Sequence, residues 1–424
     1  MIMVKPTTRK ALRLYRPCGP NGRTSRLSIQ RVNKIMTKLI VAKNPSILIL
    51  TNAPYLDGKK LFSETMLCYS YRVSTLIRYG GSLPVIILVL VGIELGFQFH
   101  PAYWAIGAIA LFIVHPLLDT IVGQNKKNNK ADPRLAKAIL YLYAIFQTVL
   151  LYRSLAASQE LFLAGISTAW YMILAVSIGV LTGSFGITFA HELFHAPDKL
   201  SRGLGVWLLL CVSYSHFRIE HVFGHHKDAA TPLDTDTALR GESFYRFLVR
   251  SFLSGYTNAW RIEAKRLTNK SSLAFIFANR FIKYSLMQAM IYALIYYFFG
   301  VVGLLFFAAQ SLVAIVLLEV VNYIEHYGLQ RKKLDSGRYE SYGPQHTWDN
   351  AHVMTNALLI NLGKHSHHHI SPSKHYQELE LLGGAFIHPY GYAVMVWFAL
   401  IPPLWFSVMD WRIDARVQAG GIQV

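Results

Sequence analysis

The stretch LFLAGISTAWYMILAVSIGVLTGSFGITFAHELFH, residues 161 to 195, joins a long apolar run to two histidines four positions apart. Residues 161 to 190 contain no charged side chain. A helix needs about 20 mostly apolar residues to cross a bilayer. The stretch therefore predicts a membrane-spanning helix that ends in the polar segment HELFH at the membrane surface.

The rest of the chain also has the composition of a membrane protein. Of its 424 residues, 53% are hydrophobic and 15% are charged, whereas soluble domains carry about 25% charged residues. We expect about six transmembrane helices, paired as three hairpins with turns at His100, near Ser158 and at Gly300. The apolar stretches are residues 83–99, 103–122, 138–152, 161–190, 284–299 and 301–323. The third and fifth are short and should extend into flanking polar residues.

The predicted fold class is an all-α integral membrane protein with a histidine-rich cytoplasmic cap. We expect a basic N-terminal tail (1–80), a membrane domain (81–390) and a C-terminal apolar segment with a tail (391–424). Pro402 and Pro403 interrupt the last segment, which favours an interfacial or packed helix over a seventh span.

Positive charge is concentrated in two segments. Before Gly80, fifteen Lys and Arg residues accompany only two acids, and residues 123 to 137 (GQNKKNNKADPRLAK) form a second basic segment. Because Lys and Arg are enriched in cytoplasmic loops, we place both segments in the cytoplasm. No zinc-finger spacing or aromatic-interleaved basic motif indicates nucleic-acid binding. The Arg-rich start could be a transit peptide, but a basic tail is favoured, and whether translation starts at Met1 or Met36 stays open.

Cysteine usage excludes some metal chemistry. The chain has three cysteines, Cys18, Cys68 and Cys211, and no Cys-x-x-Cys pair. A thiolate metal site or an iron–sulfur electron carrier built within this chain is therefore not expected.

Four histidine clusters, HELFH, EHVFGHH, NYIEHYG and HSHHH, lie on the side predicted to be cytoplasmic. Positions i, i+3 and i+4 of a helix share a face, so HELFH, EHVFGHH and HSHHH can each aim imidazoles at one point, and NYIEHYG adds His326. His367 lies about 200° around a helix from His365 and should point away. The other nine exceed what one first-row metal accepts, so two metals are predicted. These nine are His191, His195, His221, His225, His226, His326, His365, His368 and His369.

Acidic and amide residues accompany these clusters. A residue next to a ligand in sequence projects about 100° away on a helix, so it is better placed to orient another imidazole than to share its metal. For Asp119 and Glu319, which lie within apolar stretches, the alternative is a hydrogen bond that packs helices. The residues expected to support the imidazoles are Glu192, Glu220, Glu325, Glu319, Asn322 and Asp119.

Ligand type alone does not choose the metal, because imidazole suits zinc, copper, iron and nickel. HELFH matches the zinc-protease pattern, with Glu192 as general base, but that interpretation leaves three clusters unexplained. A metal transporter or sensor would need ligands along a path through the bilayer, and these lie at one end.

The motifs themselves carry a resemblance. Four segments resemble, in order and spacing, the motifs of the alkane 1-monooxygenase family, which belongs to the membrane di-iron hydroxylases and desaturases. The segments are HFRIEHVFGHHKDAATPLD, GESFY, NYIEHYGLQRKKLDSGRYE and NLGKHSHHHISPSKHYQEL. The resemblance covers roughly residues 80 to 385, and NYIEHYG separates this family from the fatty-acyl desaturases. All nine family ligand positions are histidine. Ala196, Lys364 and His367 depart from the family's usual Lys, Arg and Asp, and His367 removes an acid that could tune a metal.

The resemblance implies two non-haem iron ions that activate O2 as co-substrate and hydroxylate the terminal carbon of an alkane or alkyl chain taken from the lipid phase. It places the enzyme in a bacterial inner membrane with its active site toward the cytoplasm. An apolar tunnel would hold the substrate by shape, and Trp104, Leu117 and Phe185 could line it, although a packing role is favoured for each.

The implied electron donor is a separate rubredoxin-type protein with its reductase, because the chain has no Cys-x-x-Cys pair. An acidic donor could dock on Arg240, Arg331, Lys332 or Lys333, unless these residues only reflect the cytoplasmic bias of positive charge. The alternatives that remain are a hydroxylase of xylene-type methyl groups, a fatty-acyl hydroxylase or desaturase, and, less favoured, the zinc protease.

Overall fold

The computed structural model describes residues 82–126 and 133–418, which are mostly helical and belong to one compact unit, Ile77–Val424. The N-terminal tail, the start at Met36 and residues 127–132 of the second basic segment lie outside the described residues. The membrane part consists of α3 (Leu83–Gln98), η2 (Pro101–Ala105), α4 (Ile106–Ile109), η3 (Ala110–Val114), α5 (His115–Val122), α6 (Pro133–Leu163), α7 (Thr168–Leu181), η4 (Thr182–Ile187), α8 (Thr188–His195) and α14 (Arg280–His326).

The remaining elements build the polar end of the molecule. They are α9 (Lys199–Leu210), α10 (Phe217–Glu220), η5 (His221–His225), α11 (His226–Asp228), α12 (Phe244–Arg266), α13 (Ser272–Ala278), η6 (Pro344–His346), β1 (Trp348–Asp349), α15 (Val353–Leu358), α16 (His365–Ile370), η7 (Tyr376–Glu378), β2 (Phe386–Ile387), α17 (Tyr392–Ala399) and α18 (Pro402–Gln418). The two short strands pair in parallel, with Trp348 opposite Phe386.

Four helical segments are long and apolar enough to cross a membrane: Pro101–Val122, Lys137–Leu163, Thr168–His195 and Arg280–His326. The prediction of an all-α integral membrane protein is confirmed. The number of about six spans stays a prediction, because α3 has 16 residues and α14 is one helix of 47 residues.

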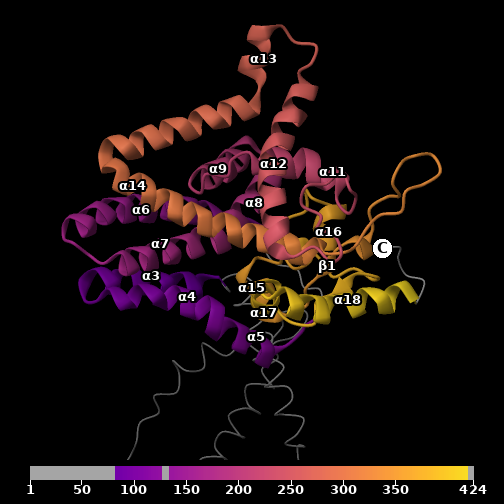
Figure 1. The fold of residues 1–424 in the computed structure, drawn as a ribbon, viewed down its shortest axis with the longest axis horizontal. Coiled ribbons are helices and arrows are strands. Elements are labelled where there is room, and N and C mark those ends of the chain that lie inside the picture. Colours follow the sequence, from indigo (N-terminus) through magenta and orange to yellow (C-terminus); the bar gives the residue numbers. More distant parts are fainter. Residues whose placement is uncertain (1–81, 127–132, 419–424) are drawn as a thin grey trace, which may run out of the picture. The chain divides into compact units, whose positions relative to one another are not determined.

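Helix α14 contains both of the apolar stretches expected between residues 284 and 323. Gly300 has a φ of 61°, which side chains other than glycine rarely adopt, and it interrupts the helical backbone there. In Figure 1 the first part of α14 runs outward from α13 to this bend, and the second part returns toward α16. The expected turn at Gly300 is therefore present as a bend between two helical arms.

The turn expected near Ser158 is misplaced. Helix α6 continues to Leu163, and the turn falls at residues 164–167, where Gly165 has a φ of 72°. Polar residues suggested an earlier break, but the helix accommodates them. Ser158 Oγ donates to the Leu155 carbonyl at 2.7 Å, and Arg153 reaches sideways to pair with Glu94 on α3.

Close backbone approaches hold the membrane helices together. The indole of Trp104 packs on Gly96, where a Cβ would lie 2.1 Å from the ring. A Cβ on Gly183, in η4, would lie 2.8 Å from Ala314 Cα on α14. Large buried aromatic residues fill the remaining space, among them Phe185, Phe189 and Phe306.

The last apolar segment forms α17 and α18, which meet at a bend of 118° just before Pro402. Trp405, Met409 and Ile413 of α18 are fully buried. The segment packs against the rest of the unit, and its first helix contributes Tyr392 to the site described below.

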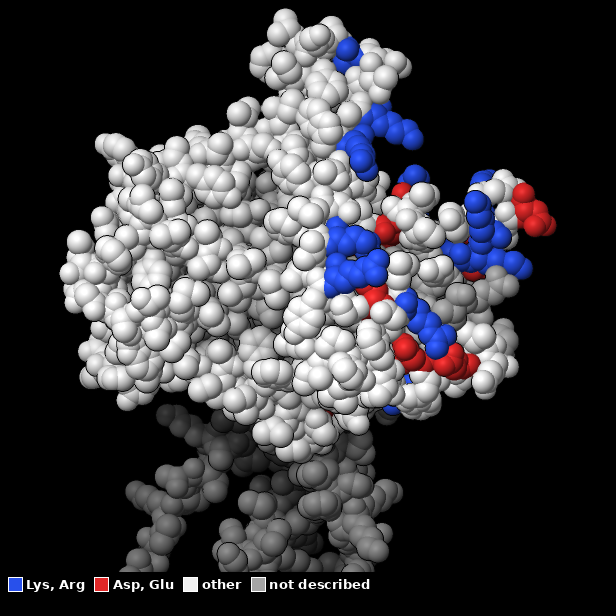
Figure 2. All heavy atoms as spheres, in the orientation of Figure 1, with Lys and Arg blue, Asp and Glu red and all other residues white. Residues whose placement is uncertain are grey.

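Charged residues are unevenly distributed. On the face shown in Figure 2, Lys, Arg, Asp and Glu lie on the half formed by α11, α12, α16 and α18, whereas the half formed by α3, α6 and α7 shows none on this face, although Arg153 of α6 pairs with Glu94 of α3. This separation is expected of a protein whose one half faces lipid and whose other half faces water.

Candidate metal centre

Nine imidazoles converge at the polar end of the membrane helices and form two groups. Within each group, one ligand nitrogen from every histidine lies within 4.8 Å of all the others. The five-histidine group contains His191, His195, His221, His226 and His368. The four-histidine group contains His225, His326, His365 and His369. The structure thus brings together all nine residues that the sequence singled out.

Three α-helices, α8, α14 and α16, carry six of these side chains. Helix α8 presents His191 and His195 one α-turn apart, and α14 ends at His326. Helix α16 carries three ligands and is held at its start by Asp349. The Asp349 carboxylate accepts hydrogen bonds from Ser366 N and Ser366 Oγ, both at 2.7 Å.

A π-helical turn, η5, spans His221–His225 and changes the expected grouping. An α-helical spacing would aim His221, His225 and His226 at one point. A π-turn instead aligns residues i and i+5, and His221 Nε2 lies 3.0 Å from His226 Nε2. His225 points to the other group, where its Nε2 is 3.1 Å from His369 Nε2.

The spacing of the nitrogens fits a shared metal ion in each group. Neighbouring Nε2 atoms lie 2.9 Å apart for His191 and His221 and 2.9 Å apart for His326 and His365. Two nitrogens about 2.1 Å from a metal and about 90° apart would be separated by about 3.0 Å. The two groups could therefore each hold a metal ion.

The protonation of these imidazoles also fits metal binding, which requires neutral rings. Burial lowers the pKa of His221, His226, His365, His368 and His369 well below the usual value, and their neighbouring imidazoles lower it further. The rings are therefore neutral near pH 7 and offer free lone pairs.

His367 belongs to neither group. Its Nε2 lies 3.0 Å from Lys374 Nζ, and its Nδ1 accepts a hydrogen bond from Glu380 N at 2.9 Å. The side chain is buried on the opposite side of α16 and ties that helix to the segment that follows it.

Asp234 is the carboxylate that holds a clustered imidazole, and it was not among the predicted residues. Its two oxygens lie 3.1 and 3.0 Å from His225 Nδ1. Burial lowers the pKa of His225, but the nearby carboxylate more than compensates, so the net shift is upward. Because Asp234 accepts a hydrogen bond from the Nδ1–H group, the lone pair of Nε2 remains free to bind a metal. The signal was available, since Asp234 closes the motif HFRIEHVFGHHKDAATPLD.

Of the predicted carboxylates, Glu325 comes nearest to the cluster. Its Oε1 accepts a hydrogen bond from the Tyr392 hydroxyl at 2.6 Å, and its Oε2 lies 3.4 Å from His365 Nε2. Glu192 instead accepts from Tyr376 N at 3.2 Å and lies 3.4 Å from His375 Nδ1. Glu192 thus connects α8 to the segment at η7.

Other predicted residues support the cap rather than touch an imidazole of the cluster. Glu220 accepts from Thr235 Oγ1 at 2.8 Å, and Glu319 accepts from the Tyr214 hydroxyl at 2.8 Å. Asp119 accepts from Thr355 Oγ1 at 2.5 Å and from the backbone N–H groups of Met354 and Thr355. Asp119 therefore joins α5 to α15, which matches the packing alternative. Asn322 lines the cavity described next.

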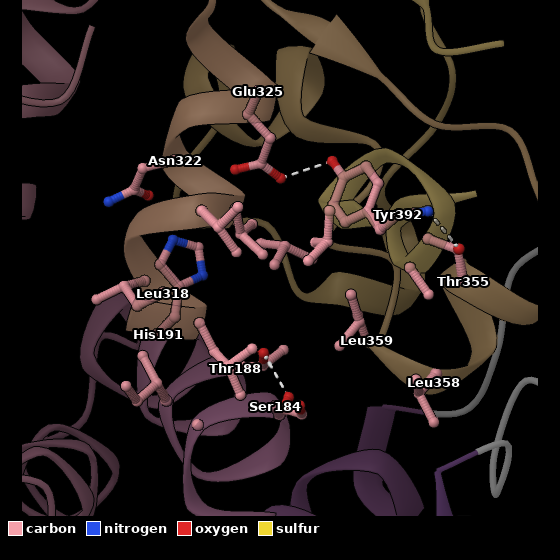
Figure 3. A pocket seen from close by; sticks show the side chains of 18 of the residues that line it. Ser184, Thr188, His191, Leu318, Asn322, Glu325, Thr355, Leu358, Leu359 and Tyr392 are labelled. Atoms are coloured by element: carbon pink, nitrogen blue, oxygen red, sulfur yellow. Dashed lines mark hydrogen bonds between the residues drawn. The ribbon is translucent and has the colours of Figure 1, made fainter. Parts of the chain in front are cut away.

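A cavity of about 90 Å³ lies beneath the histidines, between η3, η4, α14, α15 and α17. Imidazoles from both groups, His191, His221 and His365, reach its wall. Figure 3 shows His191, Glu325 and Tyr392 around the same space as Leu318 and Leu359. Most of the lining is aliphatic or aromatic, so the cavity suits an apolar molecule with one end close to the imidazoles.

The three residues proposed from sequence as tunnel lining do not line this cavity. Trp104 and Phe185 are fully buried against other helices, and Leu117 is 61% exposed on α5. Their π-helical neighbours Leu111 and Phe112 in η3, and Gly183 and Ile187 in η4, line it instead.

Comparison with known proteins gives consistent matches. Residues 167–406 match the model of the fatty acid desaturase family. Alkane 1-monooxygenase 1 of Pseudomonas aeruginosa is 39% identical over 323 residues, which cover 74% of this chain and 85% of that protein. Alkane 1-monooxygenase of Acinetobacter baylyi is 36% identical over 78% of this chain and 83% of its own length. The xylene/toluene monooxygenase hydroxylase component of Pseudomonas putida is 28% identical over 76% of this chain and 87% of its own length.

Proposed function

This chain belongs to the alkane 1-monooxygenase family, and we propose that it is a membrane-bound enzyme that hydroxylates the terminal carbon of medium- and long-chain alkanes. The observation that carries the proposal is the apolar cavity whose wall includes imidazoles of both histidine groups. An alkane has no polar group to bind, so a close-fitting apolar wall that ends at a reactive centre is what its recognition requires.

The reaction consumes one alkane, one O2, two electrons and two protons, and it releases a 1-alkanol and one water. One oxygen atom enters the terminal C–H bond and the other leaves as water. We assign the metals as two iron ions held by the nine histidines, which would supply O2 activation and C–H oxidation when bound.

The protein's own residues contribute position and water exclusion. The alkyl chain of the substrate is confined by Leu111 and Phe112 on one side and by Leu318 on the other. The hydrogen bond from Tyr392 to Glu325 fixes two polar side chains at the end of the cavity next to His365. We propose that the predicted acidic and amide residues support the imidazoles indirectly, by fixing the elements that carry them. These residues are Glu325, Glu192, Glu220, Glu319, Asn322 and Asp119.

The electron donor is proposed to be a rubredoxin-type protein that docks on the polar end with its reductase supplying it. Among the basic residues predicted for this surface, Arg240 pairs with Asp414 at 2.8 Å, and Arg331 donates to the Glu340 carbonyl at 2.6 Å. Lys332 and Lys333 are exposed. The two lysines are therefore the better candidates for contact with an acidic donor.

The location is proposed to be a bacterial inner membrane, with the histidine groups toward the cytoplasm. Support comes from the gathering of charged residues at the end that holds all nine histidines. Cysteines introduced at Ser167 and Ser336, in a chain whose natural cysteines are replaced, would test it. Ser167 should react with an impermeant reagent in intact cells, and Ser336 only after lysis. The reverse pattern would separate the centre from cytoplasmic electrons and defeat the assignment.

Product analysis tests the reaction itself. Purified protein in lipid nanodiscs, with rubredoxin and its reductase, should convert hexadecane to 1-hexadecanol and contain two iron ions per chain. Faster turnover of p-xylene, or of a fatty-acyl substrate to an alkene or hydroxy acid, would assign a sibling activity. One zinc ion per chain with peptide hydrolysis would establish the protease instead.

A further inference from the structure

Helix α12 lies across the membrane helices and has three distinct faces. In Figure 1 it runs nearly perpendicular to α6 and α7, and α13 extends beyond its end. One face packs against the rest of the unit through small and aromatic residues and through Glu263, which pairs with Arg266 and Arg280. These buried residues are Phe244, Phe247, Ser251, Gly255, Ala259 and Glu263.

The second face of α12 is apolar and exposed. Its residues recur at intervals of three, four or seven, so they form one stripe beside the packed face. Leu253 and Val249 are each 59% exposed, and Trp260 is 40% exposed. The stripe consists of Tyr245, Val249, Phe252, Leu253, Tyr256 and Trp260. In α13, Leu273 is 70% and Phe277 is 85% exposed, which extends the apolar surface.

The third face is basic. Arg246, Arg261 and Lys265 are exposed and follow one another at helical spacing, next to Arg250, which pairs with Glu242. Among the described residues, the Arg261 guanidinium and the Lys265 ammonium have no ion-pair or hydrogen-bond partner. An exposed apolar stripe bordered by Lys and Arg is the pattern of a helix that lies in the membrane interface.

A groove marks the boundary between the apolar and basic faces. It is lined by Tyr256, Thr257, Trp260, Arg261 and Phe281. Phe281 is the second residue of α14, one of the membrane-spanning candidates. The groove therefore lies where that span enters the membrane, at the depth of lipid headgroups. Trp260 packs edge-on against Phe281, with ring centres 5.6 Å apart, and the two rings form the apolar wall of the groove.

We propose that α12 and α13 form a binding surface for anionic phospholipid. The groove takes the headgroup of such a lipid, with Arg261 and Lys265 beside its phosphate and Trp260 beside its glycerol and upper acyl chain. Anionic lipid is favoured over an acidic protein because the cations border an exposed apolar stripe, which water would not cover favourably but acyl chains would. This surface is independent of the histidine groups and of the proposed reaction.

Lipid retention tests the headgroup site. The full chain, purified from nanodiscs of equal phosphatidylglycerol and phosphatidylcholine, should retain phosphatidylglycerol preferentially when bound lipids are counted by mass spectrometry. Arg261→Gln/Lys265→Gln should reduce that retention about fivefold or more. Lys332→Gln/Lys333→Gln removes the same charge from a loop at the polar end and should not change it. Equal retention of both lipids by the wild type, or no difference between the two variants, would overturn the proposal.

A second measurement examines the apolar stripe without relying on charge. A fluorophore on Phe277→Cys, in a chain whose natural cysteines are replaced, should be quenched by brominated phospholipid in nanodiscs, and the same label on Ser336→Cys should not. An unquenched label at position 277 would show that this surface faces water or a protein partner, and would overturn the proposal. Elution volume and thermal unfolding confirm that each variant is folded.

Discussion

The two histidine groups differ in how the surrounding chain holds them. The four-histidine group has Asp234 on His225 Nδ1 and Glu325 3.4 Å from His365. In the five-histidine group, within the described residues, no carboxylate contacts an imidazole. Neutral imidazoles do not offset the positive charge of a metal ion in either group, so nearby carboxylates would offset it only in the four-histidine group. The group with fewer imidazoles therefore has more negative charge beside it.

Removing one ligand from each group should have the largest effect. His195→Ala and His326→Ala should each lower turnover by more than about a hundredfold, since loss of a supporting hydrogen bond alone costs about 10- to 100-fold. Iron analysis should show the loss of one ion per chain in each variant. If each substitution emptied both groups equally, the division into two groups would be wrong.

Removing the carboxylate specific to one group should have the next largest effect. Asp234→Asn should weaken metal binding about 10- to 100-fold, because His225 loses the acceptor that fixes its orientation. Glu220→Gln is the matched control, since Glu220 is a buried acid five residues before His225 that accepts hydrogen bonds from Thr235 and Asn258 rather than from an imidazole, so its indirect support should matter less. Titration of the apoprotein with ferrous iron measures both. Equal weakening in the two variants would contradict a specific role for Asp234.

The cavity borders both histidine groups. A larger side chain in the cavity should lower substrate turnover without lowering the iron content. Ala393 lines the cavity on α17, and Ala393→Phe should lower hexadecane turnover about tenfold by overfilling the space. The iron content should stay unchanged. Leu117→Phe, on the exposed side of α5, serves as control and should retain full turnover. A tenfold loss in the control as well would indicate a general defect in packing.

The smallest effect should come from the histidine that joins neither group. His367→Ala removes contacts with Lys374 and with Glu380 N, which is worth about 1 kcal/mol of stability. At least about half the turnover should remain, because no metal ligand is lost and the change is confined to a structural contact. A His367→Ala variant as inactive as His368→Ala would show that His367 supports the metal site directly.

Sequence reasoning identified the convergent histidines because their spacing and their position at the ends of apolar stretches are local properties. It misassigned their partners in two places: on α16, an ordinary α-helix, His368 joins the five-histidine group while His365 and His369 join the other, and in η5 the backbone departs from the α-helix. The π-turn at His221–His225 cannot be inferred from an i, i+4 rule, and it decides which ligand joins which group.

Long-range contacts were the other source of error. Asp234 was overlooked because it lies in an irregular segment, away from the helices on which neighbour rules apply. The packing role favoured for Trp104 and Phe185 agrees with their burial, but Leu117, for which packing was also favoured, is 61% exposed on α5. The turn placed near Ser158 was wrong because hydroxyl and guanidinium groups can be satisfied within or beside a helix.

The π-turn of η5 also limits how the length of this helix can change. Surface loops tolerate gain or loss of residues, because their ends can move to compensate. Deleting Gly224 would leave His226 four residues after His221, a spacing that an ordinary α-turn aligns, so His225 and His226 could keep their directions. Inserting a residue after Gly224 would instead place His225 five residues after His221, in the direction that His226 now has, and rotate His226 by about 100°. The turn can therefore lose a residue, but a single added residue acts on both metal positions together.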